Sequence, residues 1–302
     1  MGRKSFKFLK IEEGELDNVL QENRELLYDF IQYLEATDHS KETVKVYESN
    51  LKLFFVWLMK YCRNKDFVDI KKRDIMNFQN YMLKGGLSPA RIRNIRSSIS
   101  SLSDFIERIL DEEEKFENFR NIVNKIPAPT LVKTREKTVL DPEQLENLLD
   151  TLVSKKKYQI ACCIAMLSYS GCRKSEIIQY KDSYFTEETL KGGLYVTPEI
   201  RTKGKGNAGK KLKKYAIKSK VDVYLNLWRE QRKELGIEID DLFVVKRDGK
   251  WECATKYTIE SWMEICEKIL KVPTYAHMYR HYFVSELKRQ GLPLDVIQKI
   301  VG

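Results

Sequence analysis

The segment at residues 277–302, HMYRHYFVSELKRQGLPLDVIQKIVG, begins with two histidines and an arginine at the start of an expected helix. His277 and Arg280 are three residues apart, so they share one helix face. A guanidinium group offers a planar fork of N–H donors that fits phosphate or carboxylate oxygens. The pattern therefore indicates an anion site, although an HxxRH sequence alone also arises by chance on helix surfaces.

A second arginine, Arg173, lies in the stretch SGCRKSEI, just after an expected turn at Gly171 and at the start of a helix. Backbone N–H groups and the positive end of the helix dipole favour an anion there. Arg173 and Arg280 together could grip the nonbridging oxygens of one phosphate. Taken alone, an arginine in this position is more often a solvated residue of a first helical turn.

Residues 201–220, RTKGKGNAGKKLKKYAIKSK, contain nine lysines or arginines and no acidic residue. Three glycines, at 204, 206 and 209, predict a mobile tip. Such a loop could close over phosphate and deliver a proton from a lysine. By itself the loop supports polyanion binding and nothing more specific.

Composition agrees with a polyanionic partner. The 302 residues carry a formal net charge of +10, and the pI is about 9.1. This surplus attracts polyanions but does not distinguish DNA, RNA and an anionic membrane. No stretch approaches eighteen uncharged apolar residues, and the N-terminus lacks the apolar run of a secretory signal. We therefore expect neither a membrane span nor secretion.

The six cysteines and three histidines do not predict a metal site. No two cysteines form a CxxC pair, and the histidines are not spaced with them as ligands. Small buried thiols in a reducing cytosol are the expected state. We expect no metal, no cofactor and no small-molecule substrate.

Four helices are predicted in the first third of the chain. Residues 1–22 are expected to form a loose arm, and residues 23–125 a small helical bundle. Ser40 and Ser88 are the expected N-caps of the second and fourth helices, and the third ends at Gly85-Gly86.

A linker and a second domain are expected to follow. Residues 126–139, IPAPTLVKTREKTV, contain two prolines and no apolar periodicity, which predicts an extended linker. Residues 140–302 read as further helices with one small sheet around the lysine-rich loop. The predicted fold class is mainly α with a small β-sheet, in two domains.

The order of these segments resembles the tyrosine recombinase or phage integrase family. SYSGCRKSEIIQYKDSYF is similar to the family's first arginine box, and the segment 277–302 is similar to its second. LSPARIRNIRSSISSLSDF is similar to the last DNA-facing helix of its helical core-binding domain. The resemblance covers roughly 23–302 and implies a two-domain clamp around double-stranded DNA, with 140–302 as the catalytic-type domain.

The resemblance also implies a role for each polar residue. Arg173 and Arg280 would bind the scissile phosphate. Lys205, or with less support Lys203, would be the general acid on the leaving 5′ oxygen. His277 would assist proton transfer.

Two further residues, Glu176 and His281, would support the pocket. The family's nucleophile is a tyrosine that forms a 3′-phosphotyrosine and lies well beyond the second arginine. Here 22 residues follow Arg280, and Tyr282, on the same helix as Arg280, is the only tyrosine among them. Tyr282 is too close to Arg280 for that role, so we expect the nucleophilic tyrosine to be absent from these 302 residues.

Two main interpretations remain. The first is a sequence-specific DNA-binding regulator of a phage or mobile element, similar to a temperate-phage repressor, that has lost strand cleavage. The second is an active site-specific recombinase or integrase whose nucleophile lies beyond residue 302. A nucleic-acid-binding protein of another fold is a third, weaker interpretation. The first two imply double-stranded DNA as partner, self-association on DNA, and the cytosol of a bacterium or phage-infected host.

Residues 60–96 contain ten lysines or arginines against three aspartates. This imbalance predicts that the fourth helix lies in or along a DNA groove, with the start of the third near phosphates. The expected DNA-contacting residues in both domains are Lys71, Lys72, Arg73, Lys84, Arg91, Arg93, Arg96, Arg201, Lys203, Lys210 and Lys211.

Overall fold

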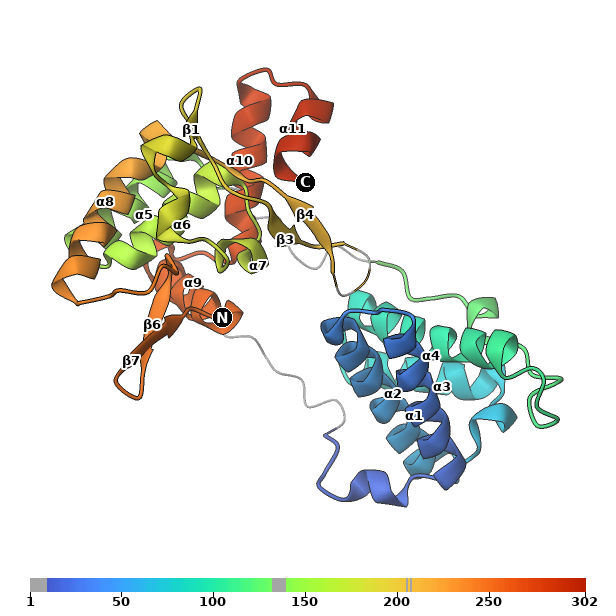
Figure 1. Ribbon diagram of the computed structural model, residues 1–302. Helices are drawn as coiled ribbons and strands as arrows, with labels where there is room; N and C mark the ends of the chain where they lie inside the picture. The colour runs from blue at the N-terminus through green and yellow to red at the C-terminus, as the bar shows by residue number, and fades with distance from the viewer. Residues whose placement is uncertain (1–9, 132–139, 205, 207) are drawn as a thin grey trace. The chain divides into compact units, whose positions relative to one another are not determined.

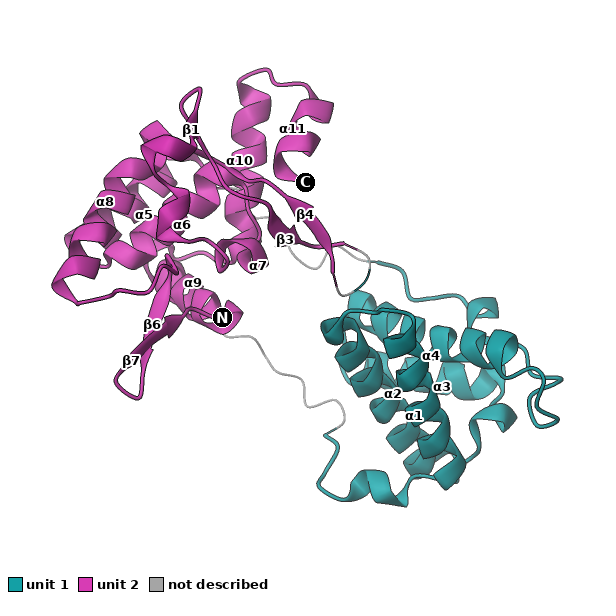
Figure 2. Ribbon diagram, viewed as in Figure 1, with its two compact units in different colours: residues 1–135, 205–207 teal, residues 136–204, 208–302 magenta. Residues whose placement is uncertain are grey.

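The computed structural model describes residues 10–131, 140–204, 206 and 208–302 (Figure 1). The chain divides into two compact units, one of residues 1–135 with 205–207 and one of residues 136–204 with 208–302 (Figure 2). Each unit has its own hydrophobic core. Of the segment predicted to be a linker, residues 132–139 lie outside the described residues.

The first unit is built from four helices and has no strand among its described residues. They are α1 (Gln21–Ala36), α2 (Lys41–Tyr61), α3 (Lys72–Lys84) and α4 (Pro89–Ile109). The predicted caps are confirmed: the hydroxyl oxygens of Ser40 and Ser88 accept hydrogen bonds from the backbone N–H groups of Thr43 and Arg91. Such a cap stabilises a helix by about 1 kcal/mol, because it satisfies a backbone N–H that has no partner within the helix.

All four helices contribute to the core of the first unit, in which α2 and α4 pack against each other. Leu51 and Phe54 from α2 and Ile95, Ile99 and Leu102 from α4 are fully buried. Burial of each such side chain contributes roughly 1.5–3 kcal/mol. This stripe of apolar residues, and not helix propensity, fixes which face of α4 is left for solvent or a ligand.

Arg96 differs from the sequence prediction. It was expected on the exposed flank of α4, but only 7% of the residue is exposed. Its guanidinium donates to the side chain of Gln79 and to the carbonyl oxygens of Val123, Ile126 and Pro127. Arg96 therefore holds the chain at the beginning of the predicted linker against the helical bundle.

The second unit surrounds α6, a helix that is buried on nearly every side. Its helices are α5 (Pro142–Ser154), α6 (Tyr158–Ser170), α7 (Lys174–Ile177), α8 (Lys218–Glu234), α9 (Lys256–Leu270), α10 (Ala276–Arg289) and α11 (Leu294–Val301). α6 packs against α5, α8 and α10 (Figure 1). A helix that is apolar all round belongs at the centre of a domain, and the sequence YQIACCIAMLSYS has that character.

Three small antiparallel sheets complete the described part of the second unit, where the sequence predicted one. The strands are β1 (Leu190–Lys191), β2 (Leu194–Val196), β3 (Ile200–Thr202), β4 (Lys210–Leu212), β5 (Tyr215–Ile217), β6 (Val244–Arg247) and β7 (Lys250–Cys253). They pair as β1-β2-β5, β3-β4 and β6-β7. The fold class, mainly α with small sheets, is confirmed.

The β6-β7 hairpin was missed, although its sequence contains a signal for it. Asp248 and Gly249 connect the strands and both have positive φ, 47° and 79°. This is the backbone of a type I′ turn, for which Asp-Gly is a preferred pair. None of the described helices is long and apolar enough to cross a membrane.

Candidate phosphate-binding site

The site is built on the turn that ends α6. Gly171 has φ 62° and ψ 19°, in the left-handed region. A Cβ atom at this position would lie 2.4 Å from Cδ1 of Phe283. Glycine is therefore required both by the backbone conformation and by the close approach of α10. The turn places Cys172 in the core and brings Arg173 to the start of α7.

Arg173 is fixed by Glu176, three residues later. The backbone N–H of Arg173 donates to Oε2 of Glu176 at 2.9 Å, and its Nη1 donates to Oε1 at 2.8 Å. Glu176 is fully buried, whereas the side chain of Arg173 is 29% exposed. The buried carboxylate therefore orients a guanidinium that is still partly exposed.

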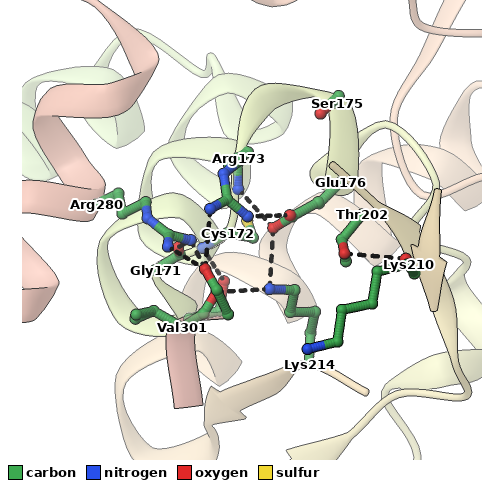
Figure 3. Close-up of polar contacts among 12 residues, drawn as sticks. Gly171, Cys172, Arg173, Ser175, Glu176, Thr202, Lys210, Lys214, Arg280 and Val301 are labelled. Carbon is green, nitrogen blue, oxygen red and sulfur yellow. Dashed lines mark hydrogen bonds and ion pairs between the residues drawn. The ribbon is translucent and has the colours of Figure 1, made fainter. Parts of the chain in front are cut away.

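Arg280 reaches the same point from α10 and is 8% exposed. Its Nη1 donates to the carbonyl oxygens of Gly171 at 2.8 Å and Val301 at 2.9 Å. Burial and, to a smaller degree, the charge of Arg173 lower the pKa of Arg280. Arginine nonetheless stays cationic in proteins, so two positive charges meet here (Figure 3).

The end of α11 supplies the carbonyl oxygens that hold these charges in place. The Gly302 oxygen accepts from Nη2 of Arg173 and from Nη2 of Arg280, each at 2.9 Å. The Val301 oxygen accepts from Arg280 and from Nζ of Lys214, also at 2.9 Å. The C-terminal end of a helix carries partial negative charge, which suits cationic donors.

Both arginines retain N–H groups for a further ligand. A guanidinium has five N–H donors. In the described part of the chain, Arg280 uses three of them on carbonyl oxygens and Arg173 uses two, on Glu176 and Gly302. The remaining donors can bind the nonbridging oxygens of a phosphate diester in the manner of a charge-assisted fork.

The structure adds Lys214 to this site, a residue that sequence reasoning passed over. Its ammonium lies 3.1 Å from Oε2 of Glu176, and its side chain is 1% exposed. Lys214 is the buried one among the described basic residues of its segment, and the count of charges alone did not single it out. The signal would have been its place two residues before the buried Ala216, which faces the core from β5.

The two histidines lie on α10 with Arg280, as the sequence predicted. The rings of His277 and His281 are 4.6 Å apart between centroids and meet edge to face. His277 is exposed in the first turn, and His281 is half-buried. On α10, His277 lies three residues before Arg280 and His281 directly follows it.

The lysine-rich hairpin is only partly described. Arg201 pairs with Lys211, and Thr202 with Lys210, across β3 and β4. The expected DNA-contacting residues of this hairpin are exposed: Arg201, Lys203, Lys210 and Lys211. Lys205, the expected general acid, lies outside the described residues.

The tyrosines nearest to Arg280 are not placed to act as nucleophiles. Tyr279 is fully buried, and burial raises its pKa well above the ordinary value. Tyr282 is 4% exposed and packs edge to face on Tyr169. Both hydroxyl groups are therefore held in the protein interior, at high pKa.

Most of the expected DNA-contacting residues of the first unit are accessible. Those that are exposed are Lys71, Lys72, Arg73, Lys84 and Arg93. Arg91 is half-buried, and its Nη1 donates to Oδ1 of Asn94 at 2.7 Å. Nε of Arg93 donates to the Pro129 oxygen at 2.9 Å. Arg96 is the exception, since its donors are directed to backbone carbonyls in the interior of the unit.

Comparison with known families gives a consistent result for both units. Residues 138–302 match the model of the phage integrase family. Residues 26–114 match a phage integrase, N-terminal SAM-like domain.

Curated relatives extend over nearly the whole chain. The SPbeta prophage-derived recombinase-like protein YomM of Bacillus subtilis is 29% identical over 99% of this chain and 89% of its own length. A tyrosine recombinase of Thermosipho africanus is 22% identical over 92% of this chain and 89% of its own length.

Solved structures share the fold. XerH site-specific recombinase, in a post-cleavage complex with a palindromic difH substrate, matches with a TM-score of 0.69. The match covers 98% of this chain and 91% of that one, at 19% identity. A lambda integrase dimer bound to a core site matches with a TM-score of 0.61 at 14% identity, over 92% of this chain and 94% of that one.

Proposed function

Since the chain belongs to the phage integrase family, we propose that it binds a specific double-stranded DNA site and acts there as a tyrosine recombinase. The observation that carries the proposal is the meeting of Arg173 and Arg280 at one point, with donors left over. Two guanidinium groups fixed before the ligand arrives can stabilise the charge that develops on a phosphate during strand cleavage.

Each remaining part of the site has a stated task in this proposal. Glu176 and the α11 carbonyl oxygens orient the arginines. His277 assists proton transfer, and His281 supports the pocket. A lysine of the β3–β4 hairpin, Lys205 or Lys203, protonates the leaving 5′ oxygen.

Contacts to the rest of the DNA come from exposed cations of both units. In the first unit we assign them to the start of α3, to Lys84 at its end, and to the Arg91 and Arg93 flank of α4. In the second unit we assign them to the β3–β4 hairpin. Contacts of this kind position a protein on the duplex, whereas base contacts from α4 would supply the sequence preference.

The nucleophile in this proposal is a tyrosine other than Tyr279 and Tyr282, because these two are buried in the core. The prediction of a repressor-like regulator without cleavage stays a prediction. The curated relatives described above are recombinases or recombinase-like, which favours the recombinase.

A covalent trapping experiment tests the proposal. The protein would first be used to select the duplexes that it binds from a pool of random sequences, which identifies its site. The selected site, nicked near its centre so that the cleaved fragment diffuses away, would then be incubated with the protein. We expect a protein–DNA adduct that survives denaturant, and none with Arg280→Ala.

The opposite result has a clear meaning. Tight, salt-sensitive binding to the selected site without any adduct would contradict the recombinase and support a DNA-binding regulator. Failure to select any site would contradict both, because each requires sequence-specific recognition of double-stranded DNA.

A further inference from the structure

Lys214 is the buried charge of this site that the proposed chemistry does not use. It lies between β4 and β5, and its backbone is fixed by Thr197 of the neighbouring segment. Thr197 N–H donates to the Lys214 oxygen, and Lys214 N–H donates to Oγ1 of Thr197, each at 2.9 Å. This anchoring directs the side chain inward, to Glu176 and the end of α11 (Figure 3).

Burying the Lys214 ammonium group at this site costs free energy. A lysine with 1% of its side chain exposed has lost its hydration. Burial lowers the pKa of Lys214, and the neighbouring Glu176 carboxylate offsets part of that effect. The two bonds to Glu176 and Val301 satisfy the group, but they do not explain why a charge is needed.

Glu176 explains it. The carboxylate already accepts two hydrogen bonds from Arg173, so Lys214 is not needed to orient it. Without Lys214, however, Glu176 would neutralise Arg173, and Arg280 would carry the one uncompensated charge among the three remaining side chains. With Lys214, three cations face one carboxylate, and a net charge of two remains.

We propose that Lys214 is a positioning residue of the phosphate pocket, which compensates Glu176 and so keeps both guanidinium charges available to one DNA phosphate. The inference rests on the proposed function, because it assumes that Arg173 and Arg280 bind a backbone phosphate. A phosphate diester carries one negative charge and gains a second when a nucleophile adds to it. The net charge of +2 in the pocket matches that doubly charged state. Lys214 itself does not touch the DNA.

The test removes the positive charge of Lys214 from the protein and, separately, the negative charge of single phosphates from the DNA. Lys214→Met removes the charge at similar size, and Lys214→Gln keeps a hydrogen-bond donor should the Met variant fold poorly. Affinity is measured on the selected site and on the same duplex with a neutral methylphosphonate in place of each phosphate in turn. Thermal unfolding is followed beside it, so that affinities are compared only where the variants are folded.

We expect one methylphosphonate position to weaken binding by the wild-type protein. On the unmodified duplex, both Lys214 variants should bind about tenfold more weakly, the size of one charge-assisted contact. On the duplex that is neutral at that position the penalty should disappear. Lys214→Arg should restore affinity even if its larger side chain lowers the unfolding temperature. Lys250→Met is the control, because Lys250 is exposed on the β6-β7 hairpin, to which no DNA contact is assigned.

Two results would overturn the inference, and they differ. If one phosphate matters to the wild type but the Lys214 penalty persists on the neutral duplex, Lys214 only stabilises the fold. If no single phosphate matters to the wild type, the pocket does not bind DNA and the proposed function fails as well.

Discussion

Nη1 of Arg280 donates to the Gly171 carbonyl oxygen at 2.8 Å, across 109 residues of sequence. This bond ties the turn before Arg173 to the helix that carries the second arginine. The same turn requires glycine, because its φ is positive and Phe283 fills the space beside it. The position of the arginine pair therefore depends on one residue that carries no charge.

Gly171→Ala should destabilise the second unit and also weaken DNA binding. The left-handed conformation costs an L-residue about 1–2 kcal/mol, and displacement of Phe283 adds about 1–3 kcal/mol. Gly236→Ala is the control, because Gly236 has φ 65° with no atom within 4 Å of an added Cβ. Urea unfolding should show a larger loss for Gly171→Ala, and only this variant should lose DNA affinity. Equal losses for both would contradict the account of the turn.

Arg173→Ala and Arg280→Ala should each lose about 1.5–3 kcal/mol of DNA-binding free energy, the size of a charge-assisted hydrogen bond. Strand cleavage should fall much further, because the pocket acts on charge that appears in the transition state. Arg247→Ala, on the exposed β6-β7 hairpin, is the matched control. Affinity comes from fluorescence anisotropy and cleavage from the nicked substrate. Cleavage that falls only in proportion to binding would argue against a catalytic pocket.

Arg96 and Arg93 should separate stability from DNA binding, although they lie one turn apart on α4. Among the described residues, Arg96→Ala leaves the Ile126 oxygen without a donor and removes one of two donors from the Val123 and Pro127 oxygens. A buried oxygen left unsatisfied costs about 1–3 kcal/mol. We expect lower unfolding free energy for Arg96→Ala. Arg93→Ala should change stability by no more than about 0.5 kcal/mol and should weaken DNA binding. An unchanged unfolding curve for Arg96→Ala would show that this anchor is unimportant.

DNA binding should weaken as pH rises. The loss should begin at a lower pH than the deprotonation of an ordinary lysine would give. Burial lowers the pKa of Lys214 below its usual 10.5, so the pocket loses this charge earlier as pH rises. Glu176, Arg280 and Cys172 face the ammonium, and burial raises the pKa of the Cys172 thiol to about 11. Its ionisation therefore follows later.

The lowered pKa of Lys214 affects the free energy of unfolding in the opposite direction. Between the lowered folded-state pKa of Lys214 and 10.5, the unfolded chain binds more protons, so this group adds stability as pH rises. Lys214→Arg should move the loss of DNA binding to higher pH, since arginine stays protonated. Affinity titrations against pH for wild type, Lys214→Arg and the control Lys213→Arg would show this. An identical alkaline profile for wild type and Lys214→Arg would count against the charge of Lys214.

The sequence by itself determined the local features of this protein. Ser40 and Ser88 begin their helices as predicted, because N-cap bonds join residues three apart. The apolar stripe of α4 follows from helical periodicity, and the burial of α6 follows from a sequence that is apolar on every face. The segments around Arg173 and Arg280 also identified the family, since residue type and order along the chain were enough.

Only the tertiary structure decided which charges are buried and what they contact. Arg93 and Arg96 look alike in sequence, yet the chain returning at residues 123–127 covers one and leaves the other exposed. Lys214 is likewise one of nine basic residues in its segment, and strand pairing across residues far apart sends it alone to Glu176 among those described. The free energy of a buried charge depends on groups brought together from distant segments, and no local pattern contains that information.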